Sequence, residues 1–191
     1  MKLVLASSSP FRQALLQKLQ LEFVCESPDI DEKALMGESI EDMVKRLSEC
    51  KARALSTSYK DALIIGSDQS ATLNGNILHK PGNFDIAFQQ LKAASGQTIT
   101  FHTGLCLLNT RTQSAETICE PFVVKFRQLT DSEIEHYLNK EQPYNCAGSF
   151  KSEALGISLF ETMQGKDPNI LIGLPLIALC RMLKDNGMPV I

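Results

Sequence analysis

The sequence predicts an α/β protein with a mixed β-sheet flanked by helices. Strands and helices alternate along the 191 residues, which favours parallel strands joined by crossovers. The segment 62–67 (Ala-Leu-Ile-Ile-Gly-Ser) is continuously apolar up to its last residue, as is typical of a central strand covered on both faces. The dipeptide Asn74-Gly75 favours a tight hairpin and therefore an antiparallel pair. The combination of crossovers and a hairpin predicts a mixed sheet.

Each element follows from a local pattern. Alternating or continuous apolar residues predict strands, and apolar residues that recur every three or four positions predict helices. The expected strands cover 3–5, 23–26, 62–67, 69–73, 77–79, 98–108, 115–126 and 157–163. The expected helices cover 10–19, 40–56, 84–94 and 131–139, with a closing helix that ends at 184. Capping signals mark three helix starts, at Ser9-Pro10, at Ser39-Ile-Glu-Asp and at Thr130-Asp-Ser-Glu133.

Composition excludes several classes of protein. The hydrophobic fraction of 43% and the charged fraction of 21% are typical of globular domains. A net charge of −3 argues against a broad nucleic-acid-binding surface. The apolar run after Met1 is too short for a signal peptide, and no segment approaches the roughly 20 apolar residues of a membrane span. We therefore expect a soluble cytoplasmic protein with no nucleic-acid or membrane partner, forming one domain over 1–191 with two lobes on one sheet.

The six cysteines show no metal-binding or disulfide pattern. None forms a CxxC pair, and none has a spacing to histidine that is typical of a metal site. They are Cys25, Cys50, Cys106, Cys119, Cys146 and Cys180. We expect reduced, mostly buried thiols.

The first predicted helix is a candidate phosphate site. The free N–H groups and the positive dipole end of a helix N-terminus suit an anion, and Arg12 adds a full charge one turn later. An ordinary capped helix is the alternative, and this segment alone favours neither.

An acidic residue ends the most apolar strand. Asp68 lies at the carboxyl end of that strand, where open α/β sheets place their ligand crevice, and a buried acid needs a partner. The adjacent Gly66 and Ser67 are small, so we expect a substrate to approach the backbone there.

Further charged residues become meaningful only as a set. Alone, Lys51 on a helix predicts a solvated face, and Asp31-Glu32 predicts a helix cap. Together, Glu32 and Asp68 could hold a hard divalent cation such as Mg²⁺ through oxygen ligands. Arg12, Lys51 and Lys80 could then neutralise a polyphosphate, while a carboxylate aligns or deprotonates an attacking water.

A set of short motifs, in order along nearly the whole chain, resembles the Maf family of nucleoside triphosphate pyrophosphatases. The motifs are Ser7-Ser-Ser-Pro-Phe-Arg12, Asp31-Glu32, Lys51-Ala52, Gly66-Ser-Asp68-Gln69, Asn74-Gly75 with Lys80-Pro81, Ser95-Gly96, Ala147-Gly148 and Gly173-Leu-Pro175. The resemblance implies a two-lobed fold with an elongated twisted sheet across a cleft, similar to that of inosine triphosphatases. It also implies that the protein uses a divalent metal cation, Mg²⁺ or Mn²⁺, as its cofactor. It implies hydrolysis between the α- and β-phosphates of a nucleotide, and a homodimer.

The resemblance also implies roles for single residues. Asp68 matches the family's catalytic aspartate, the expected base. The phosphate and metal positions match Ser8, Arg12, Glu32, Lys51 and Lys80, with Glu32 and Asp68 as metal ligands. Two departures from the family pattern are Cys50 before the helix lysine and His79 before Lys80, and His79 puts the role of Lys80 in doubt.

Three residues are expected to decide the substrate. Phe11, Gln69 and Glu153 are similar to the branch of the family that prefers 7-methyl-GTP, whereas enzymes acting on dTTP and UTP usually have Arg, Thr and Gln there. The methylated guanine carries a positive charge that strengthens stacking on an aromatic ring by about 1 kcal/mol. A carboxylate can accept hydrogen bonds from two guanine N–H groups. The alternatives are a core role for Phe11 and a plain surface role for Glu153.

Two other functions stay open at this point. One is the same hydrolysis on dTTP, UTP or another modified nucleotide. The other is a non-catalytic nucleotide-binding regulator, since some Maf relatives are linked to inhibition of septum formation. Asp68, Glu32 and Lys51 are all present, which argues against the second.

Overall fold

The computed structural model describes residues 1–191, which form two compact units. Unit 1 comprises 1–69, 102–120 and 167–191, and unit 2 comprises 70–101 and 121–166. Three strands contribute residues to both units: β3 (Ala62–Leu73), β5 (Thr98–Asn109) and β6 (Ser114–Phe126). The seven-stranded sheet has the order β2-β1-β3-β5-β6-β7, with β4 paired to β3. Its parallel and antiparallel pairs confirm the predicted mixed α/β class, whereas a single two-lobed domain around a cleft stays a prediction.

The sheet of unit 1 is parallel at its N-terminal strand. The strand β1 (Lys2–Leu5) pairs in parallel with both β2 (Val24–Cys25) and β3, with Leu3 opposite Leu63. This edge strand is shorter than the predicted 23–26, and both of its residues are exposed.

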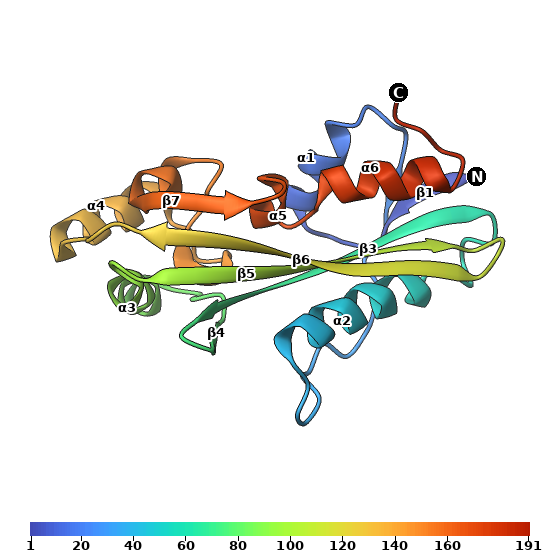
Figure 1. Ribbon diagram of the computed structural model, residues 1–191. Helices are drawn as coiled ribbons and strands as arrows, with labels where there is room; N and C mark the ends of the chain where they lie inside the picture. Colours follow the sequence, from blue (N-terminus) through green and yellow to red (C-terminus); the bar gives the residue numbers. More distant parts are fainter. The chain divides into compact units, whose positions relative to one another are not determined.

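Helices cover both faces of the unit 1 sheet (Figure 1). The helices α1 (Pro10–Gln17) and α6 (Leu176–Asp185) pack on one face, where the core contains Leu3, Leu5, Leu15, Leu16, Leu63, Ile65, Leu105, Leu107, Leu174, Leu176, Leu179, Met182 and Leu183. The helix α2 (Ile40–Ala54) packs on the other face, against Val4, Ala6, Ala62, Ile64, Cys106 and Leu108. Because side chains alternate along a strand, both faces of β3 are buried, as predicted.

Two glycines let α2 approach the sheet closely. A Cβ atom on Gly66 of β3 would lie 2.0 Å from the carbonyl oxygen of Ser48, and one on Gly104 of β5 would lie 2.2 Å from that of Val44. The prediction that Gly66 makes room for a substrate is therefore wrong: the backbone of α2 fills that space. Ser67 is likewise buried rather than open to a ligand.

Unit 2 combines antiparallel strand pairs with two helices. β4 (Asn76–Leu78) pairs with β3 across the turn at Asn74 and Gly75, whose φ angles are 50° and 81°, as a tight hairpin requires. β7 (Phe160–Gly165) pairs antiparallel with β6. The helices are α3 (Phe84–Ala94) and α4 (Asp131–Glu141), and two short 3-10 helices are η1 (Ala147–Ser149) and η2 (Leu155–Leu159).

Four phenylalanines form an aromatic cluster in unit 2. Their rings meet edge to face with centroids 4.9 to 5.5 Å apart, an arrangement favoured by the quadrupoles of the rings. The four residues are Phe101, Phe126, Phe150 and Phe160. Phe150 contacts the other three, so the cluster anchors the loop after η1.

Most predicted elements are present with shifted ends. The capping box at Thr130 and Glu133 is confirmed at the start of α4. The last predicted strand, 157–163, begins instead as η2, and β7 covers Phe160–Gly165. The short helix α5 (Asn169–Ile172) was not predicted. No helix has the length and apolar character needed to cross a membrane.

The cysteines are free, but the prediction that most are buried is wrong. All six are unpaired, Cys25 is exposed, and only Cys106 is fully buried. Burial raises the pKa of Cys106 to about 11, so this thiol stays protonated at neutral pH.

Candidate active site

The centre of the candidate site is an ion pair between α2 and β3. Lys51 Nζ lies 2.7 Å from Oδ1 of Asp68, and the two side chains are only 9% and 12% exposed. Charges this buried require partners, and each of these two residues supplies the partner of the other. No protein group donates a hydrogen bond to Oδ2 of Asp68. That oxygen is therefore free to accept a hydrogen bond from water.

Glu32 completes this group of charges from the loop that precedes α2. Its Oε1 lies 2.8 Å from Lys51 Nζ, while 61% of its side chain is exposed. The helix-cap alternative for Asp31-Glu32 is not what the structure shows, because Ser39 caps α2. Two carboxylates therefore meet one ammonium group, and one of them faces solvent.

Arg12 lies in the same unit, and the charges of both carboxylates act on its guanidinium group. Burial lowers the pKa of its guanidinium, whereas the charges of Asp68 and Glu32 raise it. Its Nε donates to the carbonyl oxygen of Gly173 at 2.9 Å. Because no other protein acceptor bonds this side chain, both terminal nitrogens remain for an anion.

The start of α1 has the geometry that the sequence predicts. Ser9 caps the helix by accepting from the N–H of Arg12, and Pro10 occupies the first turn. Ser8 is exposed, whereas the neighbouring Ser7 is buried and accepts from the N–H of Ser9. Phe11 is half-buried and lies outside the cluster that packs α1 on the sheet. Ser8 and Phe11 are thus accessible, and their substrate contacts stay predictions.

The corner between α5 and α6 binds the side chain of Arg12. Asp167 stabilises this corner and was not predicted from the sequence. Gly173 ends α5 with a φ of 117°, which favours glycine, and its carbonyl oxygen lies near both Arg12 Nε and the Ser67 hydroxyl. Asp167 is 2% exposed and accepts from the N–H groups of Asn169 and Ile177. One carboxylate thereby serves the N-termini of two helices. The only sequence signal was Asp167 before Pro168, which resembles an ordinary turn.

Gln69 is tied to the same corner. Its Nε2 donates to the carbonyl oxygen of Ile170 at 2.8 Å and lies 2.9 Å from Oγ1 of Thr103. Its amide nitrogen is therefore engaged by the protein, and its Oε1 is the atom left for a substrate. The predicted substrate contact of Gln69 is not tested by these bonds.

Lys80 and Glu153 belong to unit 2. Lys80 is exposed in the turn between β4 and α3. Glu153 is exposed between η1 and η2, and its carboxylate accepts only from Ser152, at 3.4 Å. The roles assigned to these two residues stay predictions.

Glu32 and Asp68 of unit 1 carry the kind of oxygen ligand that a hard divalent cation prefers. The carboxylate oxygens of Glu32 and Asp68 lie next to the same ammonium group, Nζ of Lys51. No cluster of three or more His, Cys, Asp or Glu side chains is placed to hold a metal. A site with two carboxylates is typical of Mg²⁺ that is bound together with the phosphates of a substrate.

Comparisons with known proteins agree on one family. The model of the family described as Maf-like protein matches residues 2–186. Three curated relatives carry the name 7-methyl-GTP pyrophosphatase. The one from Nitrosococcus oceani is 56% identical over 99% of this chain and 95% of its own length. Those from Colwellia psychrerythraea and Alcanivorax borkumensis are 53% and 54% identical, over 99% and 97% of this chain and 94% of each relative.

Two solved structures are weakly similar in fold. They are Ham1 proteins from Staphylococcus aureus and Coxiella burnetii, with TM-scores of 0.45 and 0.42 and identities of 14% and 16%. Each match covers 66% of this chain and 72% or 73% of the other.

Proposed function

Since the chain belongs to the Maf family, we propose that it hydrolyses 7-methyl-GTP to 7-methyl-GMP and pyrophosphate. The observation that carries this proposal is the identity of more than half of its residues with three relatives of that name, over almost the whole of each chain. The activity is that of a hydrolase acting on acid anhydrides. Its expected place is the cytoplasm, where it would remove modified nucleotides.

The geometry of unit 1 supports the chemistry. Asp68 Oδ2 orients a water molecule and takes its proton as the water oxygen bonds to the α-phosphorus. The bond from that phosphorus to the bridging oxygen breaks, and the bridging oxygen leaves with pyrophosphate. The 2.7 Å contact between Lys51 Nζ and Oδ1 fixes the Asp68 carboxylate and leaves Oδ2 available to act as the base. The terminal nitrogens of Arg12 bind a phosphate and stabilise the charge that develops as pyrophosphate leaves.

A divalent cation, Mg²⁺ or Mn²⁺, is the proposed cofactor. Glu32 and Asp68 would hold it, and it would neutralise phosphate charge when bound.

A panel of nucleotides tests the function. We expect kcat/KM for 7-methyl-GTP to exceed that for GTP, dTTP and UTP by at least about tenfold, because only the first pairs a cationic ring with two guanine N–H donors. Product identification should give pyrophosphate and no orthophosphate. Equal or better hydrolysis of dTTP would favour the pyrimidine alternative, and nucleotide binding without turnover would favour a regulator.

The substitution Glu153→Gln tests how the base is recognised. We expect the preference for 7-methyl-GTP over dTTP to fall about tenfold, because the neutral amide lacks the charge that balances the methylated guanine. The ratio of the two kcat/KM values is the measurement. Glu135→Gln, a change at another exposed acid of unit 2, serves as the control and should leave the ratio unchanged. An unchanged ratio in Glu153→Gln would mean that Glu153 does not recognise the base.

A further inference from the structure

A glutamine on α3 joins two backbone segments of unit 2. Gln90 Nε2 donates to the carbonyl oxygen of His79 at 2.9 Å, and Gln90 Oε1 accepts from the Ser149 hydroxyl at 2.6 Å. His79 directly precedes Lys80, and Ser149 lies four residues before Glu153. Both hydrogen-bonding ends of one side chain amide are therefore used to connect the segments that carry Lys80 and Glu153.

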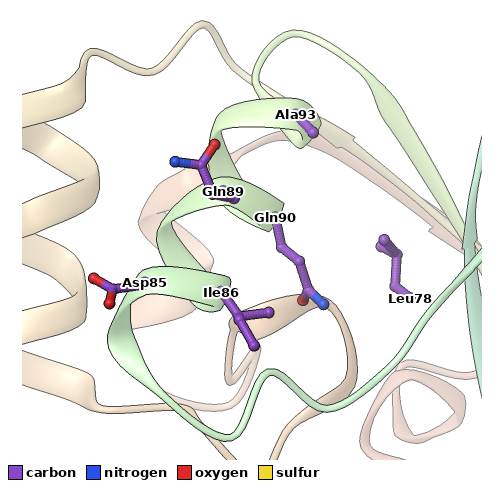
Figure 2. A pocket seen from close by; sticks show the side chains of 6 residues that line it. All are labelled: Leu78, Asp85, Ile86, Gln89, Gln90 and Ala93. Atoms are coloured by element: carbon purple, nitrogen blue, oxygen red, sulfur yellow. The ribbon is translucent and has the colours of Figure 1, made fainter.

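The side chains of Gln90 and Gln89 point to different sides of α3 (Figure 2). A pocket of about 380 Å³ is lined by Leu78, Asp85, Ile86, Gln89, Gln90 and Ala93. Figure 2 shows that Gln90 extends away from the helix toward this pocket, whereas Gln89 points to another side. The neighbouring glutamine is exposed and makes no comparable bridge.

Ser149 adopts a backbone conformation that is unfavourable for serine. Its φ is 64°, it follows Gly148 at 76°, and it is fully buried. A left-handed conformation is strained for a non-glycine residue, so glycine would fit the backbone at position 149 better. The hydroxyl that serine supplies is used in the bond to Gln90. Strain that persists at one residue is typical of sites where the side chain has a function.

A further hydrogen bond shows that the same segments converge. The N–H of Gly82 donates to the carbonyl oxygen of Tyr144 at 2.9 Å, which is a second link between them.

We propose that Gln90 and Ser149 are positioning residues that hold the turn carrying Lys80 against the loop carrying Glu153. This inference rests on the proposed function, because the sequence assigns Lys80 to the phosphates and Glu153 to the base of a nucleotide. Neither Gln90 nor Ser149 touches the reacting atoms. Their effect on the reaction passes through the two charged residues.

Two substitutions remove the bridge in different ways. In Gln90→Leu, we expect kcat/KM to fall about tenfold, mainly through a higher KM, because a looser Lys80 binds phosphates less well at every stage. Ser149→Gly removes the hydroxyl but relieves the backbone strain. We expect a similar rise in KM with a melting temperature close to that of the wild type. A merely structural role for Ser149 predicts a wild-type KM instead, and that result would overturn the proposal.

A double-mutant cycle with Lys80→Ala distinguishes positioning from general damage. Without the Lys80 amine, Gln90→Leu should change KM by less than about twofold, because the group that it positions is gone. A tenfold loss that persists in the Lys80→Ala background would contradict the proposal. Gln89→Leu is the matched control on the same helix and should behave like the wild type.

The cycle also separates this inference from the proposed function. It is measured on whichever of 7-methyl-GTP, GTP, dTTP and UTP the wild type hydrolyses fastest, because Lys80 is assigned to the phosphates rather than to the base. Fastest turnover of dTTP would refute the substrate assignment while the cycle still tests the bridge. Absence of turnover with all four nucleotides would overturn both.

Discussion

Replacement of Asp68 by asparagine is expected to lower kcat for pyrophosphate release by about a thousandfold, within the range that general-base catalysis contributes. The amide can still accept from Lys51 through its oxygen, so the contact between α2 and β3 is retained. Its nitrogen cannot take a proton from water, which removes the base without removing the shape of the site. KM should change little in comparison.

Steady-state kinetics with 7-methyl-GTP and a pyrophosphate assay measure this effect. Asp61→Asn is a suitable control, because Asp61 is an exposed acid of the same unit that pairs with Arg111 at 2.8 Å. Its loss should leave kcat unchanged, since exposed ion pairs contribute little. Release of pyrophosphate at the normal rate by Asp68→Asn would refute the assignment of Asp68 as the base.

Gly66→Ala is expected to be strongly destabilising. The new Cβ would lie 2.0 Å from the carbonyl oxygen of Ser48, a backbone atom that can move only if α2 moves. We expect the free energy of unfolding to fall by about 3 kcal/mol, as in severe overpacking of a core. The displaced helix carries Lys51, so the ion pair with Asp68 lengthens and kcat falls as well.

Urea denaturation and activity below the unfolding transition measure the two effects separately. Gly187→Ala is the comparison, because a Cβ there meets no atom within 4 Å although its φ is 77°. This control should cost only about 1 kcal/mol of backbone strain and leave kcat unchanged. Equal stability losses in the two variants would show that close packing of α2 is not what requires glycine at 66.

The parts of the fold that the sequence predicts well have local causes. Asn74-Gly75 forms the expected turn because its positive φ angles depend on those two residues alone. The capping box of Thr130 and Glu133 is likewise complete within four residues. Continuous apolar residues at 62–65 predicted a strand buried on both faces, because helices on either side of a sheet leave no polar face.

The parts that were missed depend on contacts between distant residues. Gly66 could be recognised as small, but only the position of α2 shows which group fills the space beside it. Asp167 accepts a hydrogen bond from the N–H of Ile177, ten positions later. The corner that it stabilises contains Gly173, which accepts from Arg12 across 161 positions of sequence.

In the candidate site, the motifs predicted that Asp68, Lys51 and Glu32 act together. The structure places both carboxylates at the Lys51 ammonium group, and the roles of the three residues stay predictions. They did not show that Gln69 commits its amide nitrogen to Ile170. Motif spacing reports which residues are present, whereas the hydrogen bonds that orient them come from segments outside the motifs.

The division of unit 1 into three separated segments has a consequence for the order in which the chain becomes active during synthesis. All residues of unit 2 have been made once position 166 is reached, but unit 1 still lacks 167–191. Those last residues include Gly173, the partner of Arg12, and Asp167, which fixes the corner around it. In a growing chain, Asp68 and Lys51 are therefore synthesised well before the residues that hold Arg12 in place. One face of β1 is covered by residues of α6 as well as of α1, so the core on that face is complete only after α6 has been made.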